Sequence, residues 1–157
     1  MASDMYCGAL AALVRRFPGG LERLVLSLEH CDGVDDADLE ALGTSLPLAL
    51  RELDLTCKSC IGFSDKGVAA VAKGLPKALK SLRIDMRATM TISEASAAAL
   101  IKNLPESLES LFMSFFPGIF AKFGGHTGIK LSGKAAIQEW RRKALQAVRS
   151  SRSCSVL

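Results

Sequence analysis

Prolines recur at a constant interval along most of this 157-residue chain, and each follows a large apolar residue. Three residues after each of these prolines begins the pattern L-x-x-L-x-L, with Ile or Met as the last residue in two of the copies. The prolines are Pro18, Pro47, Pro76 and Pro105, and the apolar triplets are Leu21, Leu24, Leu26; Leu50, Leu53, Leu55; Leu79, Leu82, Ile84; and Leu108, Leu111, Met113. A constant period of about 29 residues is typical of a solenoid, in which each repeat is one structural unit stacked on its neighbours.

Each repeat combines a strand pattern with a helix pattern. The alternating apolar residues at the end of each triplet predict a short strand with one buried face. Asp35, Ser64 and Ser93, which are spaced by the same interval as the prolines, are good helix N-cap residues, and the helical patterns end near Ser45, Gly74 and Asn103. We therefore expect an α/β fold with right-handed crossovers, about four parallel strands on a concave face and helices on the convex face.

Over roughly residues 4–113 the sequence resembles the leucine-rich repeat family, most closely its ribonuclease-inhibitor-like or cysteine-containing subclasses. The family places an Asn or Cys where this chain has Glu29, Lys58, Arg87 and Phe116, and Cys31 and Cys60 follow two residues later. The resemblance implies a non-catalytic module that binds another protein through its concave face. The alternative it implies is a regulator, inhibitor or activator, of an enzyme or small GTPase.

The repeat pattern divides the chain into five segments. Residues 1–16 match a partial repeat and predict an N-terminal capping helix, because Leu10 and Leu13 lie one repeat interval before Leu39 and Leu42. The remaining segments are the repeats at 17–113, a Phe-rich insertion at 114–131, a basic amphipathic helix at 132–149 and a flexible tail at 150–157 that ends in Cys-Ser-Val-Leu.

The insertion is rich in phenylalanine. Phe115, Phe116, Phe120 and Phe123, together with Phe112 just before it, make up five of the seven phenylalanines in the chain. One interpretation is a cap that covers the exposed apolar end of the last repeat. The other is a hydrophobic loop whose aromatic side chains dock onto a partner.

Side chains between the apolar positions of each strand are expected to point outward and to form three rows across the concave face. The rows are Arg23, Glu52, Ser81, Ser110; Val25, Asp54, Arg83, Phe112; and Ser27, Thr56, Asp85, Ser114. Opposite charges in neighbouring strands predict the pairs Arg23 with Glu52 and Asp54 with Arg83. These rows are either simple solvated charge ladders or the protein-binding face, for which the candidates are Arg23, Val25, Glu52, Asp54, Arg83, Asp85 and Phe112.

Catalytic chemistry is not indicated. The two histidines, His30 and His126, fall in different loops, and the sequence contains no Gly-rich phosphate loop. Asp35, Asp36 and Asp38 are placed to favour a helix N-terminus rather than to bind a metal. Cys57 and Cys60 have C-x-x-C spacing but lack a second ligand pair, so we expect neither a zinc site nor redox activity. No metal, cofactor or enzyme activity is predicted.

The C-terminal helix is expected to be amphipathic. Ser132 is its expected N-cap, and Ile137, Trp140, Ala144 and Val148 fall on one face. The basic residues that could contact a membrane are Arg141, Arg142, Lys143, Arg149 and Arg152. A capping helix with a solvated basic face, a helix on an anionic membrane and a polyanion-binding helix are the alternatives. No nucleic-acid motif accompanies these charges, so we expect no nucleic-acid partner.

The final tetrapeptide fits the C-a-a-X pattern for prenylation at Cys154, and its terminal Leu is typical of geranylgeranylation. Residues 122–157 hold eight basic residues and one acidic residue, whereas residues 1–121 hold 12 basic and 15 acidic residues. One lipid chain plus a basic segment is the combination that stable membrane anchoring requires. We expect a cytoplasmic protein whose partner is an unidentified protein. If Cys154 is lipidated, the protein is attached peripherally to a membrane, and if the C-a-a-X match is fortuitous, Cys154 is a free cysteine.

Overall fold

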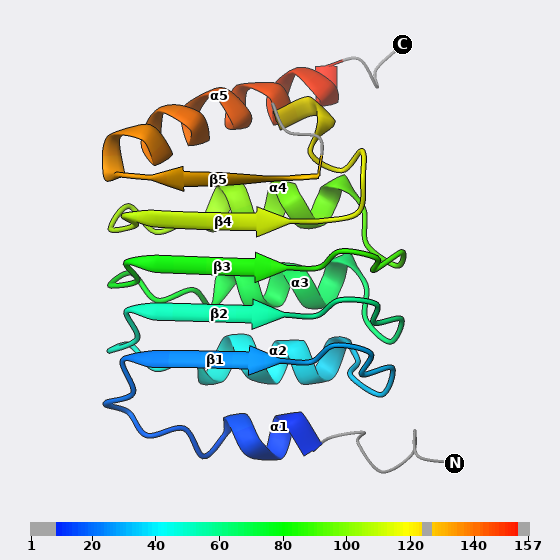
Figure 1. Ribbon diagram of the computed structural model, residues 1–157, viewed down its shortest axis with the longest axis vertical. Coiled ribbons are helices and arrows are strands. Elements are labelled where there is room, and N and C mark those ends of the chain that lie inside the picture. Colours follow the sequence, from blue (N-terminus) through cyan, green and yellow to red (C-terminus); the bar gives the residue numbers. More distant parts are fainter. Residues whose placement is uncertain (1–8, 124–126, 154–157) are drawn as a thin grey trace.

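The computed structural model describes residues 9–123 and 127–153, with side chains up to residue 150. The chain forms an α/β fold in which strands of an open, mostly parallel sheet alternate with helices (Figure 1). The five strands lie in the order β1 (Arg23–Ser27), β2 (Glu52–Thr56), β3 (Ser81–Asp85), β4 (Ser110–Ser114) and β5 (Gly128–Ser132). The first four strands are parallel to one another, and β5 is antiparallel to β4.

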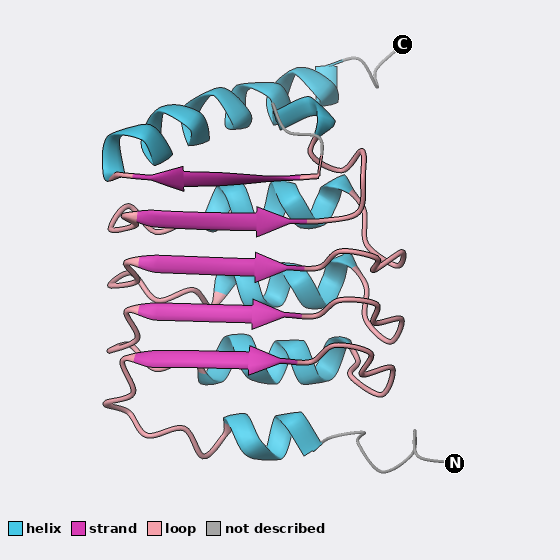
Figure 2. Cartoon of the chain, viewed as in Figure 1, coloured by secondary structure: helices cyan, strands magenta, loops and turns pink. Residues whose placement is uncertain are grey.

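The described helices lie behind the sheet or beyond its two edges, and none of them covers the other sheet face (Figure 2). These helices are α1 (Ala9–Val14), α2 (Asp36–Ser45), α3 (Asp65–Lys73), α4 (Glu94–Asn103) and α5 (Lys134–Ser153), with a 3-10 turn, η2 (Ala121–Phe123), before β5. None of them is both long and apolar enough to cross a membrane.

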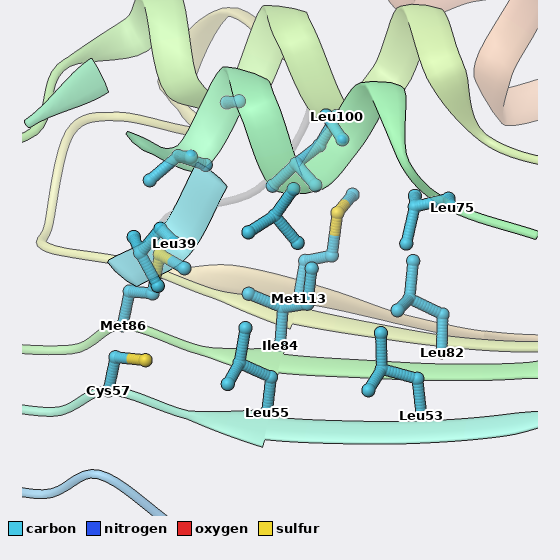
Figure 3. Packing of buried hydrophobic residues seen from close by; sticks show 14 of the residues in the cluster. Leu39, Leu53, Leu55, Cys57, Leu75, Leu82, Ile84, Met86, Leu100 and Met113 are labelled. Atoms are coloured by element: carbon cyan, nitrogen blue, oxygen red, sulfur yellow. The ribbon is translucent and has the colours of Figure 1, made fainter. Parts of the chain in front are cut away.

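Strand register follows the repeat interval without a slip. Leu24 lies opposite Leu53, Leu53 opposite Leu82, and Leu82 opposite Leu111. These leucines point to the helix layer, where they pack with Leu39, Leu100 and other buried side chains into one core (Figure 3). The predicted strand pattern and its buried face are therefore confirmed.

The predicted helix N-caps are also confirmed. The Asp35 side chain accepts a hydrogen bond from Asp38 N at 2.9 Å, and the Asp38 carboxylate accepts one from Asp35 N at 3.4 Å, so the two form a capping box. Ser64 and Ser93 each accept a hydrogen bond from the backbone two residues later. The acidic cluster at residues 35–38 thus helps to fix the start of α2.

Acidic residues in the first helical turns join neighbouring repeats. Asp36 accepts hydrogen bonds from Ser64 N, Ser64 Oγ and Gly67 N, each at 2.8 Å. One repeat later, Asp65 does the same with Ser93 N at 2.7 Å and Ser93 Oγ at 2.6 Å. Burial by itself raises the pKa of both carboxyls, but these hydrogen bonds outweigh it, so each pKa lies below its usual value of 3.8.

This arrangement predicts loss of stability in acid. A carboxyl whose pKa is lower in the folded state stabilises the fold above its unfolded-state pKa, and that contribution disappears as the pH falls below about 4. In urea titrations, the free energy of unfolding should change little between pH 7 and 5 and fall steeply below about pH 4. A double variant, Asp36→Asn with Asp65→Asn, keeps the side-chain shape and should show a smaller fall, and an unchanged fall would contradict this assignment.

Loop residues after the strands repeat in conformation as well. His30, Ser59 and Ala88, at the same position of successive repeats, all have positive φ angles between 56° and 60°. Cys60 Sγ donates to Leu28 O at 2.9 Å, and Thr89 Oγ1 donates to Cys57 O at 2.8 Å at the equivalent position one repeat later. The repeat position that Cys60 and Thr89 share therefore ties each loop to the loop before it.

The C-terminal segment differs from its expected boundaries. Residues 128–132 of the predicted insertion and helix form β5, so Ser132 ends a strand instead of capping a helix. Gly133, with a φ of 90°, lets the chain turn, and α5 begins at Lys134. The helix continues to Ser153, so a flexible tail from residue 150 was a wrong prediction, and residues 154–157 lie outside the described residues. At the other end, α1 confirms a helix within residues 1–16, of which residues 1–8 are not described.

Candidate protein-binding face

The sheet face opposite the helices, called here the outward sheet face, carries the predicted rows of side chains. Strand register places Arg23 beside Glu52, Asp54 beside Arg83, and Asp85 beside Ser114, as the sequence pattern predicted. Strand β5 adds a fifth column that the pattern did not predict, with Lys130 opposite Phe112. The complete rows are Arg23, Glu52, Ser81, Ser110, Ser132; Val25, Asp54, Arg83, Phe112, Lys130; and Ser27, Thr56, Asp85, Ser114, Gly128.

Both predicted cross-strand ion pairs form on this face. Arg23 Nε lies 3.3 Å from Glu52 Oε2, and Arg83 Nε lies 3.6 Å from Asp54 Oδ1. Arg23, Glu52 and Arg83 are well exposed, so each pair contributes at most about 1 kcal/mol to stability. The charges therefore remain accessible to a partner that offers complementary groups.

An arginine stacked on an aromatic ring lies at the centre of the face. The guanidinium carbon of Arg83 is 4.1 Å from the centroid of the Phe112 ring. This cation–π contact holds the guanidinium against the ring, while the Arg83 side chain stays 44% exposed. Val25, in the same row, is 57% exposed, so the row also offers apolar contact area.

Asp85, by contrast, is buried, and its predicted place among the exposed binding residues was wrong. Its carboxylate is 0% exposed and accepts hydrogen bonds from Arg87 Nε at 3.0 Å and Arg87 Nη2 at 2.9 Å. Lys58 Nζ and Arg83 Nη2 each lie 3.8 Å from the same carboxylate. Burial by itself raises the pKa of Asp85, but the Arg87 hydrogen bonds and the nearby cations lower it by more. The pKa of Asp85 is therefore below its usual value.

Lys58 and Arg87 also belong to this face, although the sequence pattern did not single them out as binding residues. They lie one repeat apart, just after β2 and β3, and the shared repeat position was the available signal. Lys58 Nζ also lies 3.1 Å from Oε1 of Glu29, which holds the same position in the repeat before. The charged surface therefore extends from the strands into the loops that follow them.

The outward sheet face is too shallow for an enclosed small-molecule site. A hollow on this face, lined by residues from β1, β2 and β3 that include Arg23, Asp54 and Arg83, has a volume of about 140 Å³. Pockets for small ligands usually enclose about 300 to 1,000 Å³. A broad face of exposed charges around an aromatic residue is better suited to another protein surface.

The Phe-rich segment packs inward, so the docking-loop interpretation was wrong for three of its four residues. Phe115 and Phe120 are 0% exposed and Phe123 is 7% exposed. The rings of Phe115 and Phe120 meet edge to face with centroids 5.0 Å apart, and Trp140 Nε1 donates to Phe123 O at 3.0 Å. They are buried because the last repeat has no following repeat to cover it. Phe116, 41% exposed, is the one that remains accessible.

The basic face of α5 is only partly available to a membrane. Arg141 donates to Ile101 O at 3.2 Å and Lys102 O at 3.0 Å, so it caps the C-terminal end of α4 and was wrongly assigned as a free membrane contact. Arg142 and Lys143 are exposed and pair with Glu139 at 2.9 and 3.2 Å. Arg149 is exposed, whereas the side chain of Arg152 and all of Cys154 lie outside the described residues.

The C-x-x-C thiols are buried inside the loop layer. Burial and the neighbouring thiols raise the pKa of Cys57, and burial, the largest effect, raises the pKa of Cys60. Both are therefore protonated at neutral pH, the unreactive form of a thiol. Within residues 9–123 and 127–153, no three His, Cys, Asp or Glu side chains are grouped so that they could hold a metal ion. His126 is not among the described residues.

Comparison with known protein families finds no family model that matches this sequence. The curated proteins likewise contain no match to it. The repeat pattern and the geometry of the outward sheet face therefore carry the assignment of function.

Proposed function

We propose that this chain is a leucine-rich repeat solenoid that acts without catalysis, by binding a partner protein on its outward sheet face. Three independent features repeat at the same interval and support this assignment. They are the paired leucines of the strands, the N-cap residues of α2 to α4, and the left-handed loop residues His30, Ser59 and Ala88. A sheet face free of the described helices is the surface that such a stack offers to other proteins.

The observation that carries the binding proposal is the stack of the exposed Arg83 side chain on the partly buried Phe112 ring. Arginine and large aromatic residues are over-represented where protein interfaces derive most of their affinity. Asp54 on one side and Lys130 on the other give this centre both signs of charge. We therefore expect a partner surface that pairs an acidic group with Arg83 and covers the Phe112 ring.

Charge reversal at the centre of this face tests the proposal. With tagged protein as bait and quantitative mass spectrometry, Arg83→Glu should reduce recovery of specific partners by about tenfold or more, because loss of a central residue typically costs about 2 kcal/mol. Lys66→Glu, which makes the same charge change at an exposed position of α3, is the matched control and should retain them. Equal recovery with both variants would show that the partner binds elsewhere.

We further propose that the C-terminus tethers this binding module to an anionic membrane through a prenyl group on Cys154. Basic residues upstream of Cys154 support this proposal: Arg142, Lys143 and Arg149 are exposed on α5, whose last described residue directly precedes Cys154. Each basic residue near an anionic surface adds up to about 1 kcal/mol to membrane binding.

Expression in eukaryotic cells tests the tether. The wild-type protein should carry the added mass of one prenyl group and sediment with membranes, and Cys154→Ser should lose both properties. Membrane binding of the wild type should also weaken as salt is raised, because the basic residues are screened. A wild-type protein with the unmodified mass would exclude the lipid anchor without affecting the assignment of the outward sheet face.

A further inference from the structure

Strand β1 is the first strand of the sheet, and among the described residues no strand lies on its other side. Within the sheet, β1 pairs with β2. Just before the strand, Glu52 N donates to Glu22 O at 3.0 Å, and just after it, Leu28 N donates to Thr56 O at 2.7 Å. Alternate residues of a parallel strand bond to opposite neighbours, so the even-numbered residues of β1 face β2. The backbone groups of Arg23, Val25 and Ser27 therefore point to the open edge.

Core positions beside this edge are less buried than their equivalents in every later repeat. Leu26 is partly exposed, whereas Leu55, Ile84 and Met113 at the same repeat position are 0% exposed. Leu21 is also partly exposed, whereas its counterparts Leu50, Leu79 and Leu108 are 0% exposed. Leu28 is partly exposed as well, whereas its counterparts Cys57, Met86 and Phe115 are 0% exposed. In the later repeats the preceding strand helps to cover these positions. The first repeat thus lacks the apolar cover that one more strand would provide.

The helix layer, however, already extends past β1 within the described residues. Helix α1 packs beside α2, with Val14 0% exposed and Ala11 N donating to Asp38 Oδ1 at 3.1 Å. It lies beyond β1, at the open edge of the sheet (Figure 2). A second copy paired through its own β1 would bring a second α1 into the layer that α1 and α2 already fill. What fits beside β1 is a single strand without a helix of its own.

Charges at the two ends of β1 define what kind of strand is favoured. Arg15 and Arg16 are exposed in the segment between α1 and β1, whereas Glu29 and Asp32 are exposed in the loop after β1. An added strand would be attracted most if its acidic end lay beside the two arginines and its basic end beside the two acids.

We propose that the open edge of β1 binds an extended segment of a partner protein as an additional strand. The segment would have apolar side chains at alternating positions, an acidic end beside Arg15 and Arg16 and a basic end beside Glu29. Its backbone would bond to Arg23, Val25 and Ser27, and its apolar side chains would cover Leu26 and its neighbours. This is strand addition, in which backbone hydrogen bonds supply affinity and alternate side chains supply specificity. It uses a surface separate from the centre of the outward sheet face.

The test uses the full protein and a synthetic peptide, Glu-Glu-Leu-Thr-Leu-Thr-Leu-Lys-Lys, labelled for fluorescence anisotropy. Val25→Pro removes one amide donor from the open edge without removing a bond to β2, and proline is tolerated at such edge positions. It should weaken peptide binding by at least about tenfold, because a peptide carbonyl loses its donor. Val25→Thr keeps the amide and should bind within about threefold of the wild type.

Amide hydrogen exchange of the wild-type protein provides a second measurement that does not depend on how the proline variant folds. Saturating peptide should slow exchange of the Val25 amide by at least about tenfold, whereas the Leu24 and Leu26 amides, already bonded to β2, should change little. The proposal would be overturned if Val25→Pro bound the peptide as tightly as the wild type does, or if the peptide left the exchange rate of the Val25 amide unchanged. It would also be overturned if a peptide whose leucines do not alternate bound the wild type equally well. Protection of Val25 by self-association in the absence of peptide would overturn it as well.

Discussion

Replacement of Phe120 by aspartate is expected to lower the free energy of unfolding by more than about 4 kcal/mol, whereas Phe116→Asp should change it by less than about 1 kcal/mol. The two residues lie in the same short segment and would be equivalent in an exposed aromatic loop. Phe120 is instead 0% exposed, between the rings of Phe115 and Phe123. A carboxylate there would be cut off from solvent, and the cavity left by the ring would add to the cost.

Urea titration followed by circular dichroism measures both variants, and tryptophan fluorescence gives a local report. The chain has one tryptophan, Trp140, which is hydrogen-bonded to Phe123 O, so its emission follows the packing of α5 on this segment. Phe120→Asp should shift that emission to longer wavelength even in the absence of urea. If both variants were equally stable, the aromatic segment could not be the cover of the last repeat.

Replacement of Gly74 by alanine is expected to cost about 3 kcal/mol or more, which is unusually large for the addition of one methyl group. A Cβ built at Gly74 would lie 1.9 Å from Gly43 O and 2.5 Å from Gly43 C. Those atoms belong to the backbone of α2, so the clash cannot be relieved by a rotamer change and the end of α3 would have to move away from α2. Backbone strain is not the cause, because Gly74 has a φ of −84°, which alanine adopts readily.

Gly19→Ala is the matched control, since nothing lies within 4 Å of a Cβ at that position. Thermal unfolding should show a midpoint lowered by roughly 6 to 12 °C for Gly74→Ala and an unchanged or slightly raised midpoint for Gly19→Ala. Similar midpoints for the two variants would contradict the close approach of α2 and α3.

The rows of the candidate site could be predicted because parallel strands one repeat apart pair in register. A constant period without insertions fixes which residue lies beside which, as the Arg23–Glu52 and Asp54–Arg83 pairs show. Burial within the rows could not be predicted in this way. Asp85 has the same row position as Thr56, yet it is buried because Arg87 folds back over it, and the path of a long flexible side chain does not follow from spacing.

The structure at the C-terminal end of the sheet could not be predicted from the repeat pattern either. Strand β5 has two partly buried apolar residues, Ile129 and Leu131, and no copy elsewhere in the chain, so its pairing with β4 had no periodic signal. Arg141 falls on the basic face of α5 by sequence, but its guanidinium reaches the end of α4, 39 and 40 residues earlier. Such contacts depend on how α5 packs against α4.

The sequence by itself determined the strands, the helix starts and the register between repeats, because each follows from local patterns that return at a constant interval and from contacts between neighbouring copies. The tertiary structure decided how one end of the sheet is closed by Phe120, β5 and α5, why no described strand covers β1 at the other end, and which charges of the outward sheet face stay exposed. Those features depend on contacts that occur once, between segments without a repeated counterpart, and only the packing of the whole chain selects them.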